Sequence, residues 1–131
     1  MYKKKIMILS GIIAIILIVV SSCSKTATLL EDKSAAITTT VSFSKDVAPI
    51  LTANCAKSGC HNGSISPNLS SGSAYTSLTN GFVSTASPSS SLVYLWLTGK
   101  ESVTMPLGGT NNPSNINGYI LAWITQGAKN N

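Results

Sequence analysis

Two cysteines and the only histidine of this 131-residue chain fall within seven consecutive positions, in the stretch CAKSGCH that covers residues 55–61. The segment from Phe43 onward has about 90 residues and contains long stretches rich in Ser, Gly, Asn and Pro. A domain of this size is only marginally stable unless a covalent staple or a cofactor strengthens its core. The cluster is therefore expected to be a disulfide, a metal site or the attachment point of a haem.

The first 22 residues have the pattern of a secretion signal. Three lysines at positions 3–5 precede residues 6–20, which are apolar except for Ser10 and Gly11. A membrane span needs roughly 20 apolar residues, so this shorter run has the length of a signal-peptide core. The sequence VVSSC that follows resembles the lipobox of bacterial lipoproteins, in which the cysteine, here Cys23, is acylated and the chain is cut just before it. An uncleaved anchor with a chance cysteine is the alternative.

This pattern predicts a signal peptide over residues 1–22, a lipidated tether over 23–42 and a folded domain over 43–131. We expect the protein in the bacterial cell envelope, outside the cytoplasm, lipid-anchored at the periplasmic face or the cell surface. After removal of the signal, six lysines stand against four acidic residues, a net charge of +2, and the chain has no arginine. Nucleic-acid binding needs dense cationic contacts to phosphate, so no nucleic-acid partner is expected.

Three segments of the domain have helical patterns, which predicts a small all-α fold of three to four helices with long loops. They are SFSKDVAPILTANC (42–55), SSSLVYLWLTGK (89–100) and SNINGYILAWITQGAKNN (114–131). In the first, Asp46 suits the first turn, and Pro49 costs one hydrogen bond or a kink. The expected N-caps are Ser44, Ser89 or Ser90, and Ser114, and the expected helix stops are Gly99 and Gly127.

The cluster fits a disulfide or a metal ion incompletely. A bridge between Cys55 and Cys60 closes only a small loop and leaves His61 without a role. A structural zinc site needs four ligands, which the mature chain lacks once Cys23 is lipidated. A blue-copper site uses two histidines together with cysteine and methionine, whereas this chain has one histidine. Copper remains the stronger of the metal alternatives.

A haem makes use of every unusual residue. Two thiols can add to the vinyl groups of a haem, and a histidine directly after the second thiol can ligate the iron, as in the C-x-x-C-H signature. A methionine can ligate the opposite side of the iron. Met105, the only methionine that remains after signal removal, lies 44 residues beyond His61. The motif here has four residues between the cysteines instead of two.

Residues 43–129 resemble a small monohaem c-type cytochrome domain of bacterial lipoproteins, including the planctomycete-type cytochrome c domains. The matching pieces are DVAPILTANCAKSGCH, SSLVYLWLTGK, the MP at 105–106 and INGYILAWITQGAKNN. Such domains often have a widened cysteine spacing. The resemblance implies one covalent haem c, with Cys55 and Cys60 as thioether positions, His61 as the proximal ligand and Met105 as the distal ligand.

The resemblance also implies that the first and last helices cross beside the haem, which brings Val47, Ile50 and Leu51 near Tyr119, Ile120 and Trp123. We expect Trp96 and Trp123 to be core residues. A haem with both axial positions filled has no open site for substrate, so the domain is expected to be an electron carrier, not an enzyme. Its expected partners are redox proteins of a bacterial envelope electron-transfer chain.

Three alternatives stay open: a copper-binding carrier, a haem enzyme or sensor with an open iron site if Met105 is not a ligand, and a disulfide-stapled interaction module without cofactor.

Overall fold

The computed structural model describes residues 36–107 and 114–131 and contains only helices and loops in these ranges. The elements are the π-helix η1 (Phe43–Val47), α2 (Ala48–Asn54), α3 (Ala74–Thr79), the 3₁₀-helix η2 (Pro88–Ser90), α4 (Leu92–Leu97) and α5 (Ser114–Thr125). The prediction of an all-α fold with three to four helices and long loops is confirmed for this part of the chain. The predicted signal peptide and Cys23 lie outside the described residues.

The first helical segment has its N-cap two residues before the predicted cap. Ser42, not Ser44, is the N-cap, because its Oγ accepts a hydrogen bond from the backbone N–H of Lys45. The carboxylate of Asp46 accepts the N–H of Ser42 at 2.7 Å, so the two side chains cap the helix reciprocally. Pro49 lies in the first turn of α2, where its missing N–H costs least.

Both predicted glycine stops are correct. Gly99 follows α4 with φ +68° and Gly127 follows α5 with φ +98°, the left-handed conformation that glycine adopts without steric cost. The cap predicted for α4 is wrong, because the N-cap is Ser91 and not Ser89 or Ser90. The Ser91 hydroxyl accepts a hydrogen bond from the N–H of Ser84 instead of capping the helix. The helix α5 begins at Ser114, whose side chain lies outside those described.

The short helix α3 lies in a segment predicted to be loop, and η2 covers the residue before the predicted helical segment 89–100 and its first two residues. Only Ala74 and Leu78 are buried in α3, and no residue of η2 is buried. Two apolar positions four residues apart are too few to produce a recognisable helical period. The prediction missed α3 because tertiary contacts, rather than an amphipathic pattern, hold it in place.

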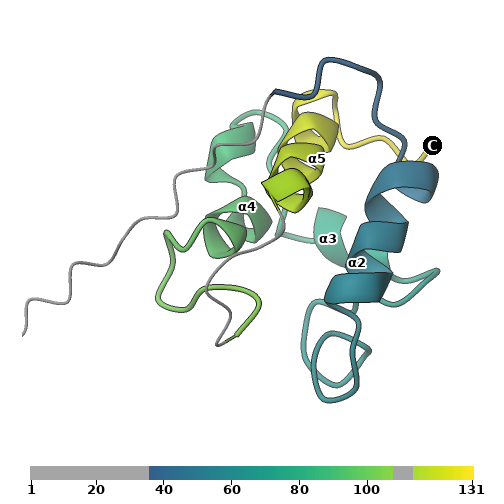
Figure 1. Ribbon diagram of the computed structural model, residues 1–131, viewed down its shortest axis with the longest axis vertical. Coiled ribbons are helices and arrows are strands. Elements are labelled where there is room, and N and C mark those ends of the chain that lie inside the picture. Colours follow the sequence, from purple (N-terminus) through teal and green to yellow (C-terminus); the bar gives the residue numbers. More distant parts are fainter. Residues whose placement is uncertain (1–35, 108–113) are drawn as a thin grey trace, which may run out of the picture.

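The core lies where η1, α2, α4 and α5 meet, and Figure 1 shows α5 between α4 and α2. The Trp123 side chain is only 1% exposed, and its ring centroid lies 5.1 Å from that of Phe43. The expected proximity of the first and last helices is observed. All six residues expected to meet belong to one core cluster or pack against it. Val47, Leu51, Ile120 and Trp123 are buried members, and Ile50 and Tyr119 pack against them.

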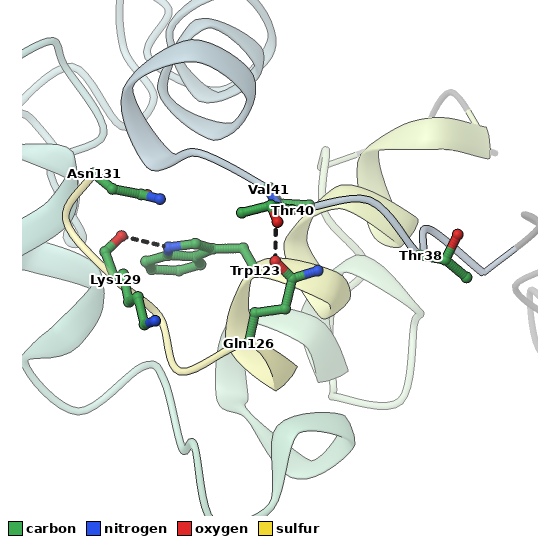
Figure 2. Close-up of a pocket in the computed structure, with 7 residues that line it drawn as sticks. All are labelled: Thr38, Thr40, Val41, Trp123, Gln126, Lys129 and Asn131. Carbon is green, nitrogen blue, oxygen red and sulfur yellow. Dashed lines mark hydrogen bonds between the residues drawn. The ribbon is translucent and has the colours of Figure 1, made fainter.

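Residues before the predicted domain boundary also pack against the fold. Val41 is buried, and its N–H donates to Oε1 of Gln126 at 2.8 Å. Figure 2 shows this junction, where the side chains of Val41 and Gln126 border a cavity of about 440 Å³ beside Trp123. The end of the segment predicted to be a tether therefore takes part in the folded structure. This cavity is lined by neither of the domain's cysteines nor by His61.

None of the helices in residues 36–107 and 114–131 has the length and apolar character that crossing a membrane requires.

Candidate cofactor site

The four residues that the sequence singles out in the domain line one apolar cavity. Cys55, Cys60, His61 and Met105 border a cavity of about 130 Å³, which Leu97 also lines. Cys55, His61, Leu97 and Met105 border in addition a smaller cavity of about 40 Å³. The two cavities therefore adjoin, and the cysteine and histidine cluster meets a methionine that lies 44 residues further along the chain.

The end of α2 and the turn after it position the two thiols. Cys55 is the C-cap of α2, with its N–H bonded to the carbonyl oxygen of Leu51 at 2.8 Å. The chain then turns at Gly59, which has φ +75°, and the N–H of His61 returns to the carbonyl oxygen of Cys55 at 3.2 Å. This turn lets cysteines separated by four residues border the same space.

The two thiols have different surroundings. Both cysteines are free thiols; Cys55 is half-buried and Cys60 is exposed. Burial raises the pKa of the Cys55 thiol; the positive charge of Lys57 acts in the opposite direction, and Cys60 adds a smaller upward contribution. Cys55 is therefore held as a neutral thiol against the core, while Cys60 lies at the mouth of the cavity.

The hydrogen bonds of His61 fix which ring nitrogen carries the proton. Its Nδ1 lies 3.1 Å from the carbonyl oxygen of Pro67 and 3.3 Å from that of Ile65. Carbonyl oxygens only accept hydrogen bonds, so Nδ1 must be the donor. In the neutral imidazole this arrangement leaves the lone pair on Nε2, which is the state needed for metal ligation.

Met105 is held in the cavity by the end of α4. Its backbone N–H donates to the carbonyl oxygen of Trp96 at 3.1 Å, and its side chain is partly buried against the core. In the sequence, Met105 follows Thr104 and precedes Pro106, which is exposed. A soft sulfur donor therefore lines the same cavity as the imidazole.

Most residues of the cavity wall are not predicted from the sequence. Phe82 and Trp96 line the smaller cavity of about 40 Å³, and their ring centroids lie 5.8 Å apart. Both tryptophans were predicted to be core residues. The prediction is correct for Trp123, which is buried, whereas Trp96 is half-buried and lines the cavity. At the mouth, Ile65 is 53% exposed and Leu107 is 75% exposed. Apolar residues in loops give no periodic signal, so no pattern in the sequence assigns them to a site.

The chemistry of the donors limits what this site can hold. In the part of the chain that the structure describes, no three His, Cys, Asp or Glu side chains lie together as a metal-binding group. The cavity instead combines two thiols, one imidazole nitrogen and one thioether with apolar walls. Such a set suits a cofactor that is itself largely apolar and that binds through sulfur and nitrogen.

Comparisons of this chain with protein-family models, with curated proteins and with solved structures found no match.

Proposed function

We propose that the domain is a c-type cytochrome that carries single electrons through one covalently bound haem c. The observation that carries this proposal is the meeting of Cys55, Cys60, His61 and Met105 around one apolar cavity. These residues come from the end of α2, the turn after it and a segment beyond α4. Few cofactors use two thiols, a neighbouring histidine and a distant methionine together.

Each residue has a chemical role in the proposal. The thiols of Cys55 and Cys60 would hold the haem covalently, and Nε2 of His61 would bind its iron, because the Nδ1 proton is already donated to the carbonyl oxygen of Pro67. The sulfur of Met105 would supply a second ligand to the iron. When bound, haem supplies an iron that alternates between the ferrous and ferric states. With His61 and Met105 both serving as ligands, no position on the iron would remain for a substrate, so the domain would be a carrier and not an enzyme.

The proposed location follows from the signal and from Cys23. We place the domain in the bacterial cell envelope, outside the cytoplasm, held at the periplasmic face or cell surface by acyl chains on Cys23. Its partners are then redox proteins of an envelope electron-transfer chain.

A copper-binding carrier is the second candidate. The same cavity offers thiol, imidazole and thioether donors, and copper prefers such soft ligands. This alternative needs no covalent bond between the protein and its cofactor, which is the property that separates the two proposals.

The deciding experiment is mass spectrometry of the full chain matured in a host that attaches haem to proteins. We expect the wild type to keep a haem mass in denaturant, with absorption bands that change on reduction. The double variant Cys55→Ala/Cys60→Ala loses the covalent mass, and Ser58→Ala, in the same loop, keeps it. A Cys55–Cys60 disulfide without haem mass contradicts the proposal. Bound copper without haem favours the copper carrier.

A further inference from the structure

The end of α4 contacts the Met105 segment at more than one point. The carbonyl oxygen of Trp96 accepts the N–H of Met105 at 3.1 Å and the N–H of Gly99 at 3.2 Å. A single hydrogen bond fixes a position but leaves the direction of the chain around it free. A second contact close by would restrict the orientation of the Met105 side chain in the cavity further.

Gly99 and Thr104 supply this second contact. A Cβ atom added at Gly99 would lie 3.1 Å from Oγ1 of Thr104 and 3.6 Å from its Cγ2. The shorter distance is tighter than ordinary contacts, so Thr104 would have to shift by a few tenths of an ångström. Thr104 directly precedes Met105, and the shift would pass to Met105 through one peptide unit.

We infer that Gly99 is a positioning residue for Met105: the absence of a side chain lets Thr104 approach the end of α4, and this approach directs the methionine sulfur into the cavity. The inference rests on the proposed function, because the sulfur is an iron ligand only if haem is present. It adds to that function a residue that neither lines the cavity nor donates to the cofactor.

The chain contains a matched control for the backbone strain. Gly99 and Gly81 both have positive φ, +68° and +91°, so alanine is strained at either position. A Cβ atom at Gly81 meets nothing within 4 Å. The variant Gly81→Ala therefore reproduces the conformational penalty without the contact to Thr104.

The test compares haem-loaded full chains of the wild type, Gly99→Ala, Gly81→Ala and the double variant Gly99→Ala/Thr104→Ala. The readouts are the weak near-infrared band of sulfur-to-iron ligation in the ferric protein, the reduction potential and carbon monoxide binding. We expect Gly99→Ala to keep its covalent haem, lose the band, lower the potential and bind carbon monoxide. Gly81→Ala keeps the wild-type spectrum and potential. The double variant recovers the band, because Thr104→Ala removes Oγ1 and Cγ2.

The outcomes separate the inference from the proposed function. The inference is wrong, and the proposed function stands, if the wild type has covalent haem and the near-infrared band and Gly99→Ala leaves both the band and the reduction potential unchanged. Equal losses in Gly99→Ala and Gly81→Ala, or no recovery in the double variant, overturn it too, because backbone strain then explains the effect. If the wild type lacks the near-infrared band, Met105 is not an iron ligand. If the wild type carries no haem, the proposed function is wrong. The inference about Gly99 fails in either case.

Discussion

The Nδ1 atom of His61 lies 3.1 Å from the carbonyl oxygen of Pro67, a main-chain acceptor six residues further along the chain. This bond orients the imidazole and fixes its tautomer before any cofactor binds. We expect long-range proton–nitrogen NMR of the haem-free protein in mildly alkaline solution to show the proton on Nδ1. The signal is unambiguous because the chain has one histidine. A proton on Nε2 in the folded protein contradicts this arrangement, and the denatured protein provides the reference.

Replacing Met105 tests the distal ligand. Met105→Ala should keep the covalent haem but lower the reduction potential and allow carbon monoxide to bind, because methionine ligation favours the ferrous iron and occupies the site. Met105→His should remain six-coordinate at a lower potential. Val103→Ala is the control, since Val103 is exposed in the same segment and does not line either cavity. If the wild type is high-spin and binds carbon monoxide readily, the open-site haem enzyme or sensor becomes the better interpretation.

The cap of the first helical segment gives a stability test. Ser42→Ala removes the acceptor for the Lys45 N–H and the donor to the carbonyl oxygen of Asn131. We expect a loss of about 1 kcal/mol in the free energy of unfolding. Ser44→Ala, at the cap predicted from the sequence, should change it by less than about 0.5 kcal/mol, because its exposed hydroxyl contacts only that of Ser42 among the bonds described. Equal losses in denaturant titrations would restore Ser44 as the cap.

The cysteines should differ in reactivity before haem is attached. Burial raises the pKa of Cys55, so at a given pH a smaller fraction is thiolate, the reactive form, and alkylation is slower than at the exposed Cys60. The Cys55 rate should rise about tenfold per pH unit below its pKa. Both rates are measured by peptide mapping after a haem-free protein fragment that comprises residues 36–131 is treated with iodoacetamide. They should converge in denaturant; equal rates without denaturant contradict the burial of Cys55.

The proposed lipid anchor depends on Cys23, which lies outside the described residues. Cys23→Ser should abolish acylation and leave either unprocessed precursor in the inner membrane or soluble protein, because serine lacks the acylated thiol. Mass spectrometry of the membrane and soluble fractions distinguishes these products, with Ser24→Ala as a control that keeps the cysteine. A wild-type protein without acyl groups on Cys23 rules out the lipoprotein anchor.

The local signals of the sequence were sufficient for the helix ends that depend on near neighbours. Gly99 and Gly127 end their helices as predicted, because a left-handed residue after a helix is a local requirement that glycine meets. The caps were less reliable. Ser42, Ser44, Ser89, Ser90 and Ser91 have the same side chain, so residue type does not identify the cap; Ser42 is distinguished by its bonds with Lys45 and Asp46. The candidate donor residues Cys55, Cys60 and His61 could be singled out because they are rare residue types that lie within seven positions.

The tertiary structure alone decided which residues surround those donors. Phe82, which precedes η2 in the sequence, and Trp96, which follows it, line the same cavity. The carbonyl oxygen of Pro67 accepts the hydrogen bond of His61, and no side-chain pattern reveals a main-chain acceptor. Likewise, the contact between Gly99 and Thr104 depends on how the chain folds back after α4. Sequence periodicity reports which face of an element is apolar, whereas the site combines residues of α2 and α4 with loops whose positions are set by packing against distant elements.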